Sequence, residues 1–195
     1  MFHSLETTQR RPALFLDRDG VINVEKNYVH RVEDFEFIDG IFDLCRSAVA
    51  AAMAVVVVTN QAGIGRGHYS EYQFLLLTEW MRGRFADAGV VIDAVYYCPY
   101  HPDYGVGKYR VDSFDRKPSP GMILRARDEL SLSLENSILV GDKASDIAAA
   151  RAASVGRAIL LAADTVSISP TPDLQANSLG EINELLFGGT SPRTG

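Results

Sequence analysis

The sequence predicts an α/β fold, a doubly wound (Rossmann-like) parallel sheet with helices on both faces. Short apolar runs alternate with longer helical segments along the chain. One of these runs, residues 54–58, is almost entirely β-branched, which is typical of a strand buried on both faces. Strands that alternate with helices in this way form parallel sheets. The 195 residues suit one domain, which we expect to span residues 1–195 with a core of about 12–187 and flexible termini.

The individual elements follow from apolar periodicity and from signals at their ends. Strands are expected at residues 13–16, 54–58, 90–97, 138–140 and 158–161, and helices at residues 40–53, 71–88, 120–130, 145–153 and 179–187. Ser70 and Gln73 match a capping box at the start of the second helix, and Gly89 is placed to end it. Pro120 suits the first turn of the third helix, and Ser178 suits the cap of the last one.

The composition excludes several classes of protein. A net charge of −6 argues against nucleic acid as the main partner. The longest stretch without charged or strongly polar residues, 48–58, is too short for a transmembrane helix, which takes about 20 apolar residues. The first residues contain no apolar core of the kind a signal peptide has, and two cysteines cannot form a disulfide framework. We therefore expect a cytoplasmic protein that binds neither membranes nor nucleic acid.

Acidic residues follow the first and fourth expected strands. Ligands of doubly wound sheets bind at the carboxyl ends of the strands, where the strand order reverses. Asp17 and Asp19 follow the first strand and would share one face of an extended segment, with Arg18 pointing elsewhere. Asp142 follows the fourth strand, so the three carboxylates could share a divalent cation such as Mg²⁺. Asp-x-Asp-Gly is also a common turn sequence, and Asp146 could either support the site or serve only as an acid in the first turn of a helix.

Groups suited to an oxyanion follow the second and third strands. Thr59 ends the second strand and is followed by two amides and three glycines, and Arg66 adds a guanidinium suited to phosphate. Arg116 and Lys117 lie just before a helix start, where the helix dipole adds positive potential. Taken alone, the segment after the second strand could be a hydrophilic loop, and Arg116 and Lys117 could be a solvated basic pair. Together, the four strand ends place acids, a hydroxyl and a lysine at one rim, which chance turn chemistry does not readily produce.

These four segments resemble the signature motifs of the haloacid dehalogenase (HAD) superfamily of phosphohydrolases. They are FLDRDGVIN, VVVVTNQAGIGRG, DRKPSPGM and LVGDKASD, and the resemblance covers about residues 12–161. They are close to the branch of the D-glycero-D-manno-heptose 1,7-bisphosphate 7-phosphatases and the related histidinol-phosphate phosphatases. The stretches NYVHRVEDFEFIDG, LTEWM and YYCPYHP are especially similar to the heptose enzymes. The resemblance implies a HAD-like fold, and the absence of a large insertion after the first or third strand predicts no separate cap domain.

The resemblance also implies a Mg²⁺-dependent phosphatase that forms an aspartyl-phosphate, acting on a phosphorylated sugar on the way to nucleotide-activated heptose for lipopolysaccharide core or capsule. Asp17 would be the nucleophile, and Asp19 the general acid and then the general base. Mg²⁺ would be held by Asp17, the backbone carbonyl of Asp19 and Asp142, while Thr59 and Lys117 would bind the transferring phosphoryl group. Arg116 would help to select the substrate. The residues implied to contact substrate are Glu25, Lys26, Asn27, Tyr28, Asn60, Gln61, Ala62, Arg66, Arg116 and Lys143.

One departure from the family pattern concerns zinc. Many members carry a zinc loop written C-P-H followed by C-x-C, whereas this chain has Cys98 and Pro99 followed by Tyr100, and Ser113–Phe114–Asp115 in place of C-x-C. A structural zinc needs four nitrogen or sulfur ligands, and Cys98 with a displaced His101 supplies at most two. We therefore expect no structural zinc. The loop would be held by its own prolines and aromatic residues, which are Tyr96, Tyr97, Tyr100, Tyr104, Tyr109 and Phe114, or be more mobile.

Other functions remain as alternatives. Histidinol phosphate is the alternative substrate within the same chemistry. A receiver domain of the response-regulator type would carry its phosphorylated Asp at the end of the third strand, where this chain has Tyr96–Tyr97–Cys98. An inactive binding module is disfavoured because all four motif positions are filled. We expect a monomer, since no helix face is unusually hydrophobic, and the sequence does not distinguish the α from the β anomer of the sugar.

Overall fold

The computed structural model describes residues 10–188. The predicted flexible termini lie outside these residues. Six parallel strands form one sheet in the order β3-β2-β1-β4-β5-β6. The strands are β1 (Ala13–Leu16), β2 (Ala54–Asn60), β3 (Ala94–Cys98), β4 (Ile138–Gly141), β5 (Arg157–Leu161) and β6 (Leu174–Ala176). The helices are α1 (Ile41–Ala50), α2 (Ala62–Gly65), α3 (Glu71–Asp87), α4 (Gly121–Leu130), α5 (Ala144–Ala152) and α6 (Leu179–Phe187).

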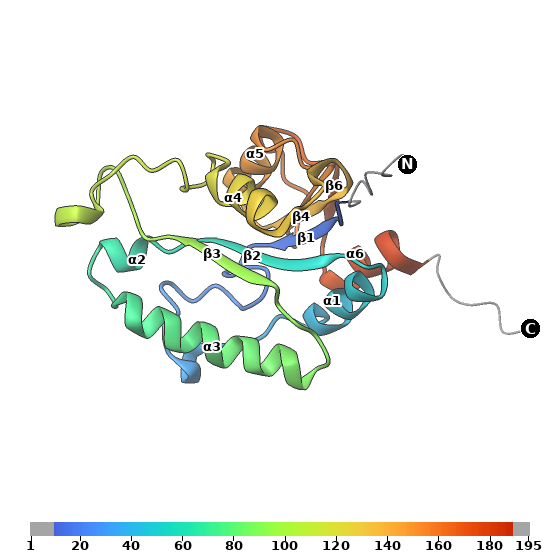
Figure 1. The fold of residues 1–195 in the computed structure, drawn as a ribbon, viewed down its shortest axis with the longest axis horizontal. Helices are drawn as coiled ribbons and strands as arrows, with labels where there is room; N and C mark the ends of the chain where they lie inside the picture. Colours follow the sequence, from blue (N-terminus) through green and yellow to red (C-terminus); the bar gives the residue numbers. More distant parts are fainter. Residues whose placement is uncertain (1–9, 189–195) are drawn as a thin grey trace, which may run out of the picture.

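Two apolar layers cover the sheet, one on each face. Successive side chains of a strand point to opposite faces, so Leu14 and Leu16 pack in one layer and Ala13 and Phe15 in the other. The first layer contains apolar side chains of α1, α3 and α6, and the second those of α4 and α5. Figure 1 shows α4 and α5 on one side of the sheet and α1 and α3 on the other. The predicted doubly wound α/β architecture is therefore confirmed.

Most predicted elements agree with the structure to within a few residues. β1 spans the predicted residues, and Ser70 caps α3 with the predicted capping box to Gln73. β3 begins four residues later than predicted: Val90 and Ile92 are buried, but pairing with β2 starts only at Ala94. The sequence analysis missed the short helix α2 and the edge strand β6.

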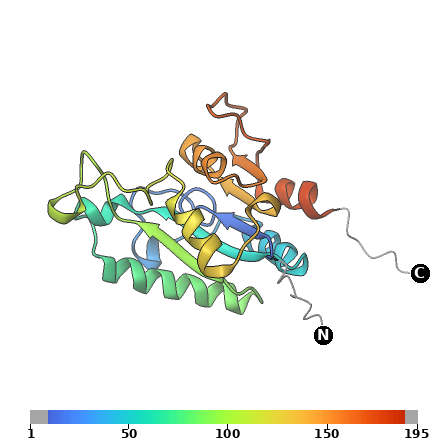
Figure 2. The same ribbon diagram turned by 45° about the horizontal axis from the view of Figure 1, so that its top comes forward.

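The carboxyl ends of all six strands lie at one edge of the sheet. In Figure 2 the strand arrows point toward the side where α2 and the long segment between β3 and α4 lie. β1 pairs with both β2 and β4, so the strand order reverses at β1. Within residues 10–188 no insertion forms a separate cap over this edge, and in the same residues no helix is long and apolar enough to cross a lipid bilayer.

Candidate active site

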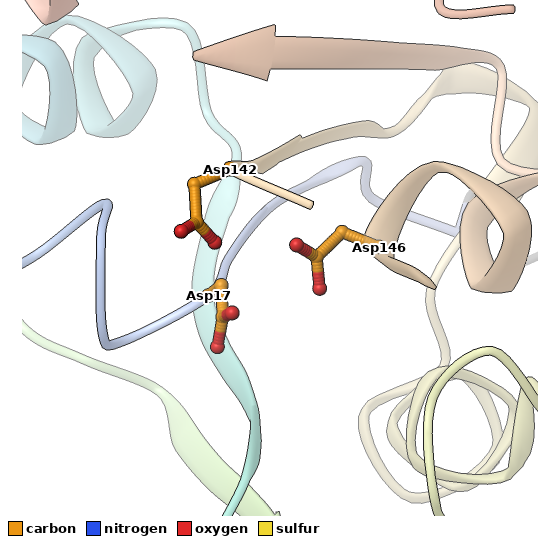
Figure 3. A group of neighbouring side chains, drawn as sticks. All are labelled: Asp17, Asp142 and Asp146. Atoms are coloured by element: carbon orange, nitrogen blue, oxygen red, sulfur yellow. The ribbon is translucent and has the colours of Figure 1, made fainter. Parts of the chain in front are cut away.

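Three carboxylates converge at the end of β1. Asp17 directly follows β1, Asp142 follows β4 and Asp146 lies in the first turn of α5. Their oxygens lie within 4.8 Å of one another, and Figure 3 shows the three side chains pointing toward a common point. Asp17 remains attached to the sheet, because its backbone N–H donates to the Val140 carbonyl at 3.1 Å. The adjacency of β1 and β4 thus brings together Asp17 and Asp142, two of the three predicted carboxylates, and the third carboxylate of the group is Asp146.

Two glycines make room for these carboxylates. Gly20 has φ = +90°, and a Cβ atom there would lie 2.2 Å from Asp142 Oδ2. A Cβ atom at Gly141 would lie 2.2 Å from Cβ of Asp146. Neither approach is possible for a residue with a side chain. The close packing of the acids therefore depends on glycine at both positions.

Lys117 is the cation of the acidic group. Its Nζ lies 3.0 Å from Asp17 Oδ1 and 2.6 Å from Asp146 Oδ1. It also donates to the Val58 carbonyl at 2.9 Å, so the buried ammonium faces two carboxylates and one carbonyl. Asn60 fixes the backbone of Lys117 by accepting from its N–H and donating to its carbonyl, both at 3.0 Å. The end of β2 thereby positions a lysine that lies 57 residues away in the chain.

Burial and charge shift the pKa values of this group. Burial raises the pKa of Asp17 to about 7, opposed by Lys117 and reinforced by Asp146 and Asp142. Burial also raises the pKa of Asp142, with Lys143 opposing the shift. Burial alone would lower the pKa of Lys117, but the nearby carboxylates of Asp146 and Asp17 outweigh it and raise that pKa. The group therefore contains more buried negative charge than Lys117 balances.

The acidic group fits a small divalent cation. Asp142 Oδ1 is buried and has no hydrogen-bond partner, although it faces two other carboxylates. A buried, unpaired carboxylate oxygen is costly unless a cation satisfies it. The available donors are all oxygens, which suits Mg²⁺ better than zinc or copper. Magnesium as the cofactor agrees with the prediction from the sequence.

Asp19 is placed differently from the prediction. The argument from an extended segment put its carboxylate on the same side as Asp17, but the chain turns after Asp17: the N–H groups of Ile22 and Asn23 donate to the Arg18 carbonyl at 2.8 and 3.0 Å. The Asp19 carboxylate lies outside the acidic group. Arg18 does not point away either, because its Nη2 lies 2.8 Å from both Asp19 oxygens.

A cavity of about 610 Å³ opens beside these residues. It is lined by Asp19, Glu25, Asn27, Tyr28, Asn60, Gln61, Ala62, Gly63, Arg66, Tyr69, Arg116, Lys117, Pro118, Lys143 and Ser145. Most residues expected to contact substrate are among them. Lys26 is not: its Nζ is paired with Glu36 Oε2 at 2.8 Å. A larger hollow, of about 770 Å³, is lined by the segments before β4 and after α5 and contains none of the predicted site residues.

Basic side chains lie along the outer part of this cavity. Arg66 donates to the Tyr28 hydroxyl at 2.8 Å, and its guanidinium lies 4.6 Å from the ring centre of Tyr104. Burial lowers the pKa of Arg116, and the neighbouring Arg66 lowers it further, so two guanidinium groups share one region. Lys143 Nζ lies 3.5 Å from Glu25 Oε2 and 3.4 Å from Asp142 Oδ2. Arg66 and Arg116 thus add positive charge to the cavity, while Lys143 lies beside the acidic group.

The sequence and the fold are similar to those of known proteins. A protein of Burkholderia mallei, D-glycero-alpha-D-manno-heptose-1,7-bisphosphate 7-phosphatase, is 56% identical over 149 residues, which cover 76% of this chain and 79% of that protein. The D-glycero-beta-D-manno-heptose-1,7-bisphosphate 7-phosphatase of Vibrio cholerae is 52% identical over 151 residues, which cover 77% of this chain and 81% of that protein. The chain belongs to the haloacid dehalogenase-like phosphatase family.

Two further comparisons agree with membership of this family. The family model described as HAD-hydrolase-like matches residues 114–182, the part of the chain that contributes Lys117, Asp142 and Asp146. The crystal structure of D,D-heptose 1,7-bisphosphate phosphatase from B. bronchiseptica, complexed with magnesium and phosphate, superposes with a TM-score of 0.76. It is 25% identical and covers 91% of this chain and 99% of that one. HAD-like phosphatases are hydrolases, and this chain is one of them.

The segment that departs from the zinc loop of other HAD-like phosphatases is held by hydrogen bonds and ring contacts. His101 Nδ1 lies 3.2 Å from the backbone N–H groups of Asp103 and Tyr104, and Val106 N–H donates to the Gly65 carbonyl at 2.8 Å. Tyr100 and Tyr109 are in ring contact, whereas Phe114 is 64% exposed. Within residues 10–188, the group of side chains suited to a metal contains neither Cys98 nor His101. The lack of a structural zinc stays a prediction for metal analysis.

Several site residues of this HAD-like phosphatase were missed by the sequence analysis. Arg18 is 1% exposed and yet charged, Asn23 donates to Asp19 Oδ1 at 3.0 Å, and Tyr69 donates to Gln61 Oε1. Pro118 and Ser145 line the cavity. Arg18 and Ser145 stand inside the recognised motifs and could have been considered. Tyr69 also lines the cavity, but it lies outside the recognised motifs, and no spacing in the sequence marks it.

Proposed function

We propose that this protein is a Mg²⁺-dependent phosphatase that removes the 7-phosphate of D-glycero-D-manno-heptose 1,7-bisphosphate. The observation that carries the proposal is the high identity to heptose-1,7-bisphosphate 7-phosphatases over about three quarters of the chain. The converging carboxylates at the end of β1 supply the chemistry that such a reaction needs. The product would supply a route to nucleotide-activated heptose for lipopolysaccharide core or capsule.

Asp17 is the proposed nucleophile. Its carboxylate lies at the floor of the site, where an oxygen attacks phosphorus, the bond between phosphorus and the sugar oxygen breaks, and an aspartyl-phosphate forms. Lys117 lies against Asp17 Oδ1 and keeps a positive charge where negative charge develops on the phosphoryl oxygens. Thr59, buried at the end of β2, is the proposed neutral donor to the same oxygens.

Asp19 is the proposed general acid and base. It gives a proton to the departing sugar oxygen and then takes one from the water that hydrolyses the aspartyl-phosphate. Asp19 lines the cavity, and the buried Asp17 belongs to the acidic group, from which the Asp19 carboxylate is separate.

Mg²⁺ would be held by Asp17, Asp142 and the backbone carbonyl of Asp19, with Asp146 close by, and would supply charge neutralisation for the phosphoryl group and the carboxylates. Asp146 is paired with Lys117 and accepts from the Lys143 N–H at 2.9 Å, so we assign it to fixing these two residues.

The outer cations are proposed to bind the second phosphate of a bisphosphate substrate. Arg66, Arg116 and Lys143 line the same cavity as Asp19, and guanidinium groups suit phosphate oxygens. The side chains of Asn60 and Gln61 are already bonded within the protein, and the backbone N–H of Gln61 donates to the Cys98 carbonyl at 2.8 Å, so we propose that these two residues shape the substrate cavity. Glu25, Asn27, Tyr28 and Ala62 would line the path of the sugar.

A phosphate-release assay tests the proposal. Purified protein with Mg²⁺ is given both anomers of the heptose bisphosphate and histidinol phosphate, because the two relatives described above differ in the anomer they are named for. We expect kcat/KM for one heptose anomer to exceed that for histidinol phosphate by at least about 100-fold, roughly 3 kcal/mol of transition-state preference. A preference for histidinol phosphate would overturn the substrate assignment.

We further infer a monomeric protein of the cytoplasm. Both cysteines are buried and unpaired, which suits a reducing compartment. The helix α3 exposes Tyr72, Leu75 and Leu76, an apolar stripe that the sequence analysis did not expect. Light scattering after size exclusion gives the mass directly. A dimer that dissociates in a Leu76→Glu variant would overturn the monomer.

A further inference from the structure

The carboxylate of Asp19 is held by a set of buried side chains. Gln61 Nε2 donates to Asp19 Oδ2 at 2.9 Å and lies 3.0 Å from Thr59 Oγ1. Gln61 Oε1 accepts from the hydroxyl of Tyr69. Gln61 is 2% exposed and Tyr69 is 6% exposed, so neither bond is replaced readily by water. A continuous path of hydrogen bonds thus joins Tyr69 to Asp19 through one amide.

The orientation of the Gln61 amide follows from these partners. Asp19 Oδ2 accepts from Gln61 Nε2, so the NH₂ end of the amide faces Asp19. The carbonyl oxygen of the amide then points the other way into a buried region, where the Tyr69 hydroxyl is its donor. Without that hydroxyl, a buried acceptor is left unsatisfied, and rotation of the amide would withdraw its donor from Asp19.

Tyr69 is itself fixed by three segments of the chain. Its ring stacks on His30 with centres 5.0 Å apart and planes at 4°. Gly63 in α2 lies so close that a Cβ atom there would be 2.3 Å from Cε1 of Tyr69. The side chains of Ile64 and Phe74 complete its apolar surroundings. The hydroxyl is therefore held in one place relative to Gln61.

We propose that Tyr69 and Gln61 are positioning residues that hold Asp19 for proton transfer to the departing oxygen. This inference rests on the proposed phosphatase function, in which Asp19 is the acid. The Asp19 carboxyl O–H bond breaks as the phosphorus–oxygen bond breaks, and the proton goes to the leaving oxygen, so that the alcohol leaves neutral and Asp19 becomes a carboxylate. Neither Tyr69 nor Gln61 exchanges a proton in this step.

This role has a consequence that depends on the leaving group. A sugar oxygen leaves poorly without a proton, whereas p-nitrophenolate is a stable anion and leaves without help from an acid. The constant kcat/KM reports the reaction through formation of the aspartyl-phosphate. Loss of correct positioning of Asp19 therefore lowers kcat/KM for alkyl phosphates more than for p-nitrophenyl phosphate. A substitution that damages Asp17, Lys117 or the metal site instead lowers kcat/KM for alkyl phosphates and for p-nitrophenyl phosphate alike.

The experiment compares Tyr69→Phe with the wild type on the heptose bisphosphate and on p-nitrophenyl phosphate. We expect kcat/KM for the sugar phosphate to fall at least about tenfold more than for p-nitrophenyl phosphate, within the range of general acid catalysis. Gln61→Met removes the donor to Asp19. We expect it to lower kcat/KM for the sugar phosphate, relative to p-nitrophenyl phosphate, by the same factor or a larger one. Tyr97→Phe is the matched control, because it removes a hydroxyl that bonds to Glu71 at 3.3 Å in the same apolar cluster. It should leave both constants unchanged.

The outcomes separate this inference from the proposed function. Equal losses on both substrates, or no loss in either variant, would overturn the positioning role while the protein remains a phosphatase. If the wild type hydrolyses p-nitrophenyl phosphate but not the heptose bisphosphate, the substrate assignment is wrong, and an alkyl phosphate that it does hydrolyse replaces the sugar in the same comparison. A wild type that is inactive on all phosphate esters would overturn both.

Discussion

Replacing Gly20 by alanine should remove Asp142 from the metal site. Gly20 has φ = +90°, and its absent side chain is the space that Asp142 occupies. The new Cβ atom would lie 2.2 Å from Asp142 Oδ2 and 2.5 Å from its Cγ, whereas an ordinary contact is 3.4 Å or more. The carboxylate has to move by roughly 1 Å, which exceeds the tolerance of Mg²⁺ for its ligand distances.

We expect Gly20→Ala to have a large effect on activity and a modest effect on stability. A displacement of about 1 Å in a catalytic group costs on the order of 100-fold in rate. The Mg²⁺ concentration for half-maximal activity should rise about tenfold or more, because Asp142 contributes to binding the ion. The left-handed backbone conformation adds about 1–2 kcal/mol of destabilisation for a residue other than glycine. Phosphate release as a function of MgCl₂ concentration measures the rate and the Mg²⁺ concentration for half-maximal activity. Urea unfolding measures the loss of stability.

Gly89→Ala is the matched control for this substitution. Gly89 also has positive φ, +78°, but no atom lies within 4 Å of its ideal Cβ position. It follows α3 and precedes β3, at the edge of the sheet opposite to the site. We expect Gly89→Ala to lose similar stability while its rate and Mg²⁺ dependence stay unchanged. If Gly20→Ala shows the Mg²⁺ dependence of the wild type, the close approach of Gly20 and Asp142 has no role in metal binding.

Three further predictions concern the buried charges and the metal. The raised pKa of Asp17 means that the folded protein keeps a proton between pH about 4 and about 7 that the unfolded chain releases, so the metal-free protein should lose up to about 4 kcal/mol of stability as the pH rises through that window. Urea unfolding against pH measures this loss, and Asp17→Asn should flatten it and abolish turnover; an equally steep profile in the variant would contradict the assignment. Lys117→Met leaves Asp17 and Asp146 without their cation, so the free energy of unfolding should fall by about 3–5 kcal/mol at pH 8 without Mg²⁺, as measured by urea unfolding. A fall of less than about 1 kcal/mol would show that the ion pairs contribute little. Chelation with EDTA should abolish phosphate release and Mg²⁺ should restore it, and metal analysis should find no zinc; stoichiometric zinc would show that Cys98 and its loop still bind that metal.

The sheet and the placement of the acids could be predicted because both follow from strong local signals. The apolar runs that became β1, β2 and β4 are fully buried, and their ends carry the polar residues. The acids after the first and fourth strands were expected to share one cation, and the likeness of the motifs implied a HAD-like fold. Edge strand β6 was not predictable in this way, because Leu174–Ala176 is only three residues long and its middle residue, Gln175, is polar.

The geometry around Asp19 could not be derived from the spacing of the motif. Residues two apart share a face only while the chain is extended, and here the strand ends at Leu16. The tight turn that follows places Arg18 inside, where its guanidinium meets Asp19 and the Val29 carbonyl at 2.8 Å. Long-range contacts such as that of Tyr69 with Gln61 depend on how α2 packs, and no local pattern encodes that packing.

The two catalytic carboxylates are surrounded by different charges, so binding of Mg²⁺ affects the charge balance around one of them more than around the other. Around Asp17, three carboxylates face the buried ammonium of Lys117, and the half-exposed ammonium of Lys143 lies 3.4 Å from Asp142 Oδ2, so the group carries an excess of negative charge when all its carboxylates are ionised. Around Asp19, a single carboxylate faces a single guanidinium, and two amides complete its hydrogen bonds. Binding of Mg²⁺ therefore neutralises the nucleophile's surroundings and displaces a proton there, while the charge balance around Asp19 is complete without it. It follows that proton release on Mg²⁺ binding should fall as the pH is raised past about 7 and should be lost in Asp17→Asn. Calorimetry in buffers of different ionisation enthalpy measures that release, and an unchanged release in the variant would place the titrating group elsewhere.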